Sequence, residues 1–108
     1  MKVCNYRDVT PDTELPGVAL HLVISAEDGA PNFAMRVFEV QPGASTPFHS
    51  HAWEHEVFIL AGRGKLRGAD NEWELTPGDA VYVPGDEQHC FMNTGPELLR
   101  FTCCIPHQ

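Results

Sequence analysis

Six histidines occur in this chain of 108 residues, and three of them stand close together in one short segment. His49, His51 and His55 have the spacing HxHxxxH. His89 follows on a later apolar segment. Imidazole is the commonest metal ligand among side chains. A lone histidine in a strand is usually a packed or surface residue, but this spacing together with a fourth histidine favours one metal site that uses all four side chains.

The elements that must position these histidines are short β-strands. Gly and Pro number nine each, and no segment has apolar residues at helical spacing over three turns. Strand patterns and intervening Pro-Gly turns predict an all-β sandwich or barrel. The predicted strands cover residues 17–25, 33–40, 56–60, 65–67, 73–75, 80–83, 88–92 and 98–105.

Alternation of side chains along a strand assigns the histidines to faces. His49 and His51 are two residues apart and project to one side. His55 lies on the face opposite to Phe58 and Leu60. Separate strands can therefore direct four imidazoles into one interior. The remaining histidines, His21 and His107, are expected to be an ordinary strand side chain and a tail residue.

Length and charge limit the classes of function. A chain of this size forms one domain, residues 1–108, in which residues 1–16 form an irregular N-terminal arm. Fifteen acidic residues against seven Lys and Arg give a net charge of −8, so we expect no nucleic-acid partner and no binding to anionic membranes. We expect a cytoplasmic protein, because no apolar run approaches the roughly 20 residues of a membrane span. Its four cysteines lack CxxC spacing and are interpreted as free thiols.

The last strand supplies candidates for the wall of the site. Its more apolar face contains Phe101 and Cys103, which we expect to point inward near the metal. The alternative for Cys103 is a thiol that only fills core volume. Tyr82 and Arg36 are further candidates for substrate contacts lining the cavity, and surface positions are the alternative for both. The catalytic residues stay unassigned.

The histidine segment resembles the first motif of the cupin superfamily. That motif runs Gly, five residues, His-x-His, three or four residues, Glu, six residues, Gly. The corresponding positions here, within residues 43–62, are Gly43, His49, His51, His55 and Gly62. Histidine thus stands where the family usually has glutamate.

A second stretch, residues 78–93, resembles the second cupin motif, which runs Gly, five residues, Pro-x-Gly, two residues, His, three residues, Asn. The matching positions are Gly78, Pro84, His89 and Asn93. Asp86 replaces the second glycine. The chain as a whole is similar to small single-domain cupins with a four-histidine metal site. This resemblance implies a double-stranded β-helix, the jelly-roll barrel of cupins. It also implies a divalent transition metal (manganese, iron, nickel, copper or zinc) and a homodimer.

The chemistry of such a site follows from its charge. Four neutral imidazoles leave the double charge of the ion uncompensated, which favours an anionic or chelating oxygen ligand. Our leading hypothesis is a metal-dependent oxidoreductase of dioxygenase type acting on a small organic substrate. The alternatives are a metal-dependent isomerase or lyase that polarises a carbonyl, and a non-catalytic cupin that binds a small ligand.

Overall fold

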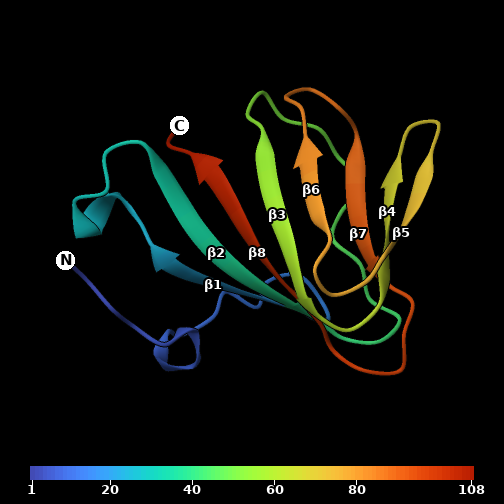
Figure 1. Cartoon of the computed structure of the whole chain (residues 1–108), viewed down its shortest axis with the longest axis horizontal. Coiled ribbons are helices and arrows are strands. Elements are labelled where there is room, and N and C mark those ends of the chain that lie inside the picture. Colours follow the sequence, from blue (N-terminus) through green and yellow to red (C-terminus); the bar gives the residue numbers. More distant parts are fainter.

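Two antiparallel β-sheets form the protein in a computed structural model that describes all residues from Met1 to Gln108. The first sheet has the strand order β1-β2-β8-β3-β6, and the second has the order β5-β4-β7. In Figure 1 the first sheet extends from the left to the centre, and the second stands at the right. This architecture confirms the predicted all-β fold. No helix of the chain is long and apolar enough to cross a membrane.

The observed elements follow the predicted pattern closely. Strands β2 and β6 have the predicted bounds, and the others differ by one residue at one or both ends. The strands are β1 Val18–Ile24, β2 Phe33–Val40, β3 His55–Ala61, β4 Gly64–Gly68, β5 Glu72–Leu75, β6 Ala80–Val83, β7 His89–Asn93 and β8 Leu99–Pro106. Two short 3-10 helices, η1 Tyr6–Asp8 and η2 Ala26–Asp28, complete the set.

The segment that precedes β3 is only partly paired. Isolated bridges join Ser45 to Met92 and His49 to His89, both on β7. Pro47 lies between them and has no N–H to donate, so a continuous ladder cannot form across it. Residues 45–51 are therefore held against β7 at separate points and form no full strand.

The core lies between the two sheets. Twelve buried residues form one cluster: Val18, Phe38, Val40, Val57, Ile59, Leu66, Leu75, Val83, Phe91, Leu99, Phe101 and Cys103. At its centre the Phe101 ring stacks on Phe38 and tilts against Phe91, with ring centroids 5.1 and 4.8 Å apart. The inward orientation of Phe101 and Cys103 predicted from alternation along β8 is confirmed by their burial.

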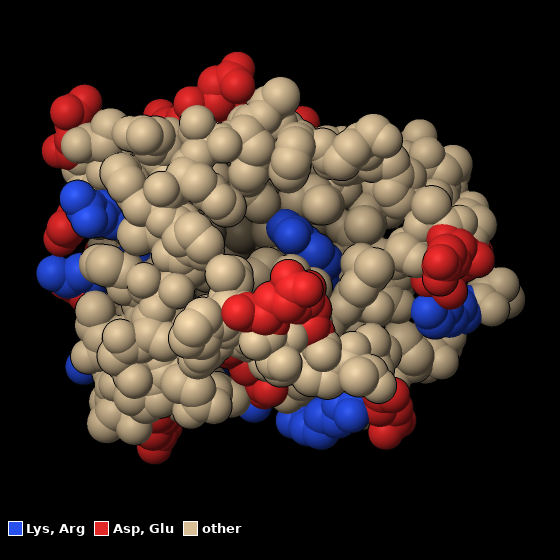
Figure 2. Space-filling model, turned by 180° about the vertical axis from the view of Figure 1, so that it is seen from behind, with Lys and Arg blue, Asp and Glu red and all other residues tan.

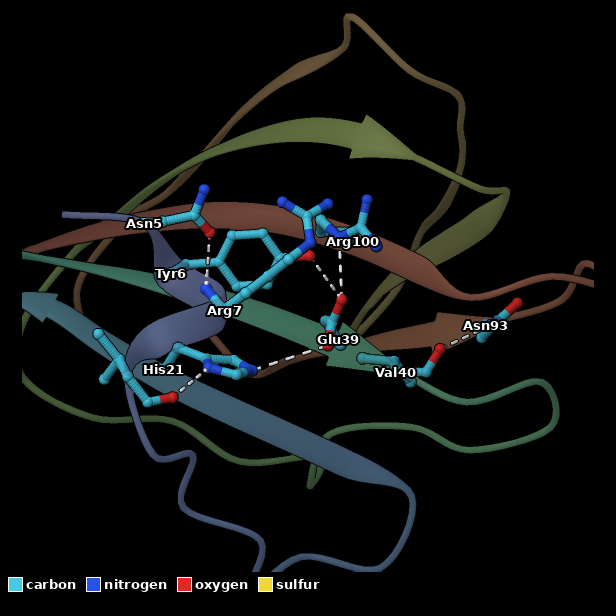
Figure 3. A network of polar contacts seen from close by, with 9 residues as sticks. Asn5, Tyr6, Arg7, His21, Glu39, Val40, Asn93 and Arg100 are labelled. Carbon is cyan, nitrogen blue, oxygen red and sulfur yellow. Dashed lines mark hydrogen bonds and ion pairs between the residues drawn. The ribbon is translucent and has the colours of Figure 1, made fainter.

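The N-terminal arm packs on the outer face of the first sheet (Figure 3). The Tyr6 hydroxyl and the Arg100 Nε both donate to Glu39 Oε2, at 2.9 and 3.0 Å. Burial alone would raise the pKa of Glu39, but the hydrogen bonds from Arg100 and Tyr6 outweigh it and hold the pKa below its usual value. The buried His21 contacts the Val9 carbonyl through Nδ1 at 3.0 Å. His21 thus contacts the arm and is not among the three mutually close histidines of the chain.

Three turn positions of the two motifs adopt left-handed backbone conformations. Gly43 and Gly62 have φ of 82° and 86°. Asp86 has φ 67°, and its N–H donates to the His51 carbonyl at 2.6 Å. Aspartate is one of the few non-glycine residues enriched in this region. The replacement of the motif glycine by Asp86 therefore preserves the turn.

Asn93, the last residue of the second motif, joins β7 to the turn that follows it. Its side-chain amide donates to the carbonyls of Val40 and Glu97 at 2.8 and 2.7 Å. Its oxygen accepts from the Gly95 N–H at 2.9 Å. Figure 3 shows the contact with Val40. The buried amide thereby satisfies backbone groups that would otherwise lack partners.

We predict that Gly62→Ala destabilises the fold more than Gly43→Ala. Both substitutions place alanine in a left-handed conformation, which costs about 1–2 kcal/mol. A Cβ at Gly62 would lie 2.3 Å from the Leu98 carbonyl oxygen, whereas a Cβ at Gly43 would meet nothing within 4 Å. The backbone overlap should add about 1–3 kcal/mol at Gly62. Urea unfolding followed by tryptophan fluorescence measures both losses, and equal losses would contradict the steric argument.

Candidate metal centre

Three imidazoles converge at one point between the sheets. The ring nitrogens of His49, His51 and His89 that could bind an ion lie within 4.8 Å of one another. Backbone bonds from His49 N to His89 O (3.2 Å) and from His89 N to His49 O (2.9 Å) place two of these residues side by side. His49 is exposed and His89 is buried, so the group extends from solvent into the barrel. Three neutral nitrogen donors in this arrangement can hold a transition-metal ion.

His55 approaches this group from the inner face of β3. Its side chain is 7% exposed, and its Nε2 lies 2.6 Å from His51 Nε2. The centroid of its ring is 5.0 Å from that of His89. The mutually close group contains only the other three histidines. His55 is thus adjacent to the three-histidine group and joins it through His51.

The outer nitrogens of two of these rings test whether the group fits a metal. His51 Nδ1 lies 2.9 Å from the Trp53 carbonyl, and His89 Nδ1 lies 2.8 Å from the Glu87 carbonyl. A carbonyl only accepts, so each Nδ1 carries a proton, which leaves Nε2 as the ring nitrogen that can bind an ion. Metal-bound histidines are oriented in this way by carbonyl partners. The donor set therefore fits a divalent ion of the kind that prefers imidazole.

A thiol and a guanidinium contact the outer nitrogen of His55. Its Nδ1 lies 2.9 Å from Cys103 Sγ and 3.3 Å from Arg36 Nη2. Arg36 Nη2 also donates to Cys103 Sγ at 3.0 Å. Burial lowers the pKa of His55 to about 3, and the charge of Arg36 adds to this effect. Burial likewise raises the pKa of the Cys103 thiol. A neutral imidazole and a neutral thiol are therefore the stable forms near pH 7.

The imidazoles form one wall of a cavity of about 180 Å³. Its lining residues are Leu15, Leu20, Arg36, Phe38, Thr46, Pro47, His49, His51, Trp53, His55, His89, Phe91, Phe101 and Cys103. The lining contains no Asp or Glu, and Arg36 is its only Lys or Arg. A larger hollow of about 680 Å³ lies along β4, β5 and β6, but His89 is its only histidine. We therefore assign the site to the smaller cavity.

This cavity is lined by most of the wall residues that the sequence predicted. Arg36, Phe101 and Cys103 are among its lining residues, but Tyr82 is not. Tyr82 is 61% exposed and stands opposite Glu56 in the β3–β6 pair. Glu56 points away from the face that carries His55, so Tyr82 points away as well. The prediction that Tyr82 lines the cavity is wrong.

Sequence reasoning also missed Trp53. Its ring lies parallel to that of His51, with centroids 4.2 Å apart and an interplanar angle of 5°. Its carbonyl is the partner of His51 Nδ1, and its side chain lines the cavity. Its position two residues after a histidine of the first motif was the available signal.

A comparison with known protein families shows to which family the chain belongs. The family described as Cupin domain matches residues 36–105, which include every histidine of the cluster. The chain belongs to the cupin family. Its β-sheet architecture is the barrel of this family, as the resemblance of its motifs implied.

Several known proteins resemble this chain over 60% or more of its length. The polyketide cyclase RemF from Streptomyces resistomycificus superimposes on all of it with a TM-score of 0.91 and 34% identity, and 80% of RemF is covered. Protein SchB of Streptomyces halstedii is 30% identical over 95 residues, which are 87% of this chain and 69% of SchB. Protein MJ1618 of Methanocaldococcus jannaschii is 33% identical over 60% of this chain, and the match spans about half (53%) of MJ1618.

We predict that the metal-free cupin loses stability as the pH falls below 6.5. The pKa of His55 is about 3 in the folded protein against 6.5 without the fold, so only the unfolded chain takes up this proton between those values. The contribution of His55 to the free energy of unfolding is complete well above pH 6.5 and is progressively lost as the pH falls toward 3. Between pH 6.5 and 5 the loss should reach about 2 kcal/mol. Urea unfolding in EDTA across this range measures it.

The matched control for this measurement is His55→Gln. Glutamine is neutral at every pH, so the variant should lose about 2 kcal/mol less than the parent protein over the same interval. Carboxylates contribute equally to both proteins and cancel in the difference. Parallel pH profiles for the two proteins would contradict the assignment.

Proposed function

We propose that this cupin binds one divalent metal ion through His49, His51, His89 and His55 and uses it in a non-oxidative cyclisation of a small enolisable carbonyl compound. The observation that carries the proposal is the convergence of imidazoles on one wall of a cavity lined mainly by aromatic and apolar side chains. The whole-chain similarity to the polyketide cyclase RemF supports it.

The contacts of His55 support its role as the fourth ligand. Two imidazole nitrogens 2.6 Å apart, as in His55 and His51, must share a proton or a cation. On its other side, the shorter contact of His55 Nδ1 is with Cys103 Sγ, at 2.9 Å. Sulfur accepts here from Arg36 as well, so the Nδ1–H of His55 can donate to it. The Nε2 lone pair is then free for the ion.

The proposed reaction follows from the composition of the cavity. A divalent ion held there supplies Lewis-acid polarisation of a carbonyl oxygen. Phe38, Phe91 and Phe101 exclude water and offer flat surfaces to a planar substrate. No carboxylate lines the cavity, so proton transfer within it depends on imidazole, the Cys103 thiol or bound water.

The size of the cavity limits the part of the substrate that it encloses. Ligand pockets usually have volumes of roughly 300–1,000 Å³, and this cavity has about 180 Å³. A portion the size of one six-membered ring fits within it. The remainder of any longer chain would extend past the exposed His49 into solvent.

A dioxygenase-type reaction, the leading hypothesis from the sequence, is the second candidate. The all-nitrogen donor set favours it, because imidazole suits iron and copper as well as zinc. Cyclisation ranks first because the similarity to RemF covers the whole chain. Oxygen uptake distinguishes the two reactions.

We predict metal-dependent ring closure of a linear seven-carbon triketone. Intramolecular aldol condensation of this probe forms one carbon–carbon bond, releases one water and yields a methylresorcinol. Protein loaded anaerobically with zinc should accelerate the reaction, as measured by chromatography of the product. The double variant His49→Ala/His89→Ala should fall from about one bound ion per chain to almost none and lose the acceleration. His107→Ala, which removes a histidine outside the cavity, should retain both.

Other outcomes of this experiment would overturn the proposal. Ring closure at equal rates with and without metal would remove the Lewis-acid role. Oxygen uptake with iron-loaded protein, without cyclisation by the zinc form, would favour the dioxygenase. Unchanged metal content in the double variant would remove the histidine assignment itself.

We further propose that a second copy of the chain covers the outer face of β3 and β6. Phe58, Leu60 and Tyr82 are 47%, 43% and 61% exposed. Phe58 and Leu60 lie on the face of β3 opposite to His55, and exposed aromatic and aliphatic side chains grouped in this way are typical of interfaces.

We predict that sedimentation velocity gives a dimer for the parent protein and a monomer for Phe58→Glu. A charge in the centre of an apolar interface would oppose association. Trp73→Glu, which changes an exposed aromatic residue on the second sheet, should stay dimeric. A monomeric parent protein at micromolar concentration would rule out the dimer.

A further inference from the structure

Arg36 places the only fixed positive charge in the cavity. The residue belongs to β2, is half-buried and lines the cavity beside the histidines. Its Nη2 contacts Cys103 Sγ and His55 Nδ1, and its guanidinium carbon lies 5.0 Å from the centroid of the Phe38 ring. The hydrogen bond to Cys103 Sγ and the packing on Phe38 hold the guanidinium in one orientation.

This guanidinium has no anionic partner in the protein. Every salt bridge of the chain is formed by other residues, and no Asp or Glu lines the cavity. The Nε atom of Arg36 is buried and makes no hydrogen bond. Arg100 on the outer face, by contrast, pairs with Glu39 at 3.0 Å. A half-buried charge without a partner is costly, so the arrangement favours an anion that enters with the ligand.

The charge of the cavity is opposite to that of the whole chain. The chain has a net charge of −8, yet the cavity contains one cation and no acid. Figure 2 shows a hollow near the middle of one face, bordered by a basic group that has an acidic group close beside it at the surface. An ion bound by the histidines would lie one imidazole ring away from Arg36, because His55 contacts Arg36 through Nδ1 and His51 through Nε2. The two positive charges would repel each other unless an anion binds close to both.

We infer that Arg36 binds a carboxylate of the substrate, so that the cavity selects small, planar, enolisable acids whose second oxygen reaches the histidine cluster. A guanidinium binds carboxylate and phosphate alike through paired N–H groups. The flat carboxylate is favoured because Phe38, Phe91 and Phe101 surround the same space and the volume is only about 180 Å³. The inference rests on the proposed function, since it names the substrate class for that cavity.

The test compares the binding of an acid and of its neutral isostere by calorimetry. Salicylate and salicylamide have nearly the same shape and differ in charge, and inorganic phosphate is the third probe. The parent protein should bind salicylate about tenfold or more tightly than salicylamide, because hydrogen bonds to a charged group are the stronger ones. The preference should persist, with lower affinity, in metal-free protein, because Arg36 remains in place there.

Variants at Arg36 separate its charge from its shape. Arg36→Met should bind the acid and the amide equally, and Arg36→Lys should keep part of the preference because it keeps charge but loses the planar fork. Arg63→Met is the matched control, because Arg63 is exposed and lies outside the cavity. It should bind as the parent does. Circular dichroism and zinc content confirm that each variant is folded and retains its metal.

The possible results distinguish this inference from the proposed function. A preference for salicylate that survives in Arg36→Met, or that is absent from the parent, overturns the role of Arg36. The choice of carboxylate is overturned if the Arg36 substitutions weaken phosphate binding more than they weaken salicylate binding. Arg36-dependent binding of salicylate without any triketone cyclisation supports the inference while removing the cyclase. Cyclisation that is unchanged in Arg36→Met, together with salicylate binding as tight as in the parent, removes only the inference.

Discussion

The candidate metal centre depends on one short piece of antiparallel pairing. The reciprocal backbone bonds between His49 and His89 join two segments that are 40 positions apart in the chain. A further bond runs from Thr46 N to Phe91 O, and the Thr46 hydroxyl accepts from Phe91 N at 2.9 Å. Pro47 limits this pairing to separate bridges, which leaves the residues that follow free to turn their imidazoles toward the barrel interior. Ligands from different segments meet because the backbone is fixed at these few points.

The same interior determines the protonation states of the ligands. Burial lowers the pKa values of His49, His55 and His89, which favours neutral imidazoles, the form of histidine that binds a metal. The burial of His55 lowers the free energy of unfolding below pH 6.5, because the unfolded chain takes up a proton there that the folded protein does not. Aromatic residues such as Phe101 stabilise the barrel around it through packing that does not depend on pH. Apolar packing in the core thus stabilises the fold, and the polar groups of the candidate site lie at the edge of that core.

Local patterns in the sequence predicted much of this structure, but not the relations between strands. The bounds of β2 and β6 follow from apolar and turn residues within each segment, and the inward face of β8 follows from alternation alone. The orientation of Tyr82 depends on its register opposite Glu56, which no local pattern contains. The stacking of Trp53 on His51 likewise arises from a loop conformation. The histidine positions were predictable because motif spacing encodes them, whereas their contacts with Arg36 and Cys103 arise only when β2, β3 and β8 pair.

The histidine at position 55 has consequences for two charges at once. Glutamate is the usual residue at this place in the cupin motif, and a carboxylate there would neutralise half the charge of a bound dication. It would also be close enough to pair with Arg36, whose Nη2 lies 3.3 Å from His55 Nδ1. Histidine removes both forms of compensation, so a bound ion and the guanidinium would each retain an unmet preference for an anion. An ion held with the help of His55 Nε2 would stand across one imidazole ring from Arg36, so a single bidentate acid could satisfy both, and the affinity for such an acid should depend on His55 and Arg36 together more than on either residue alone.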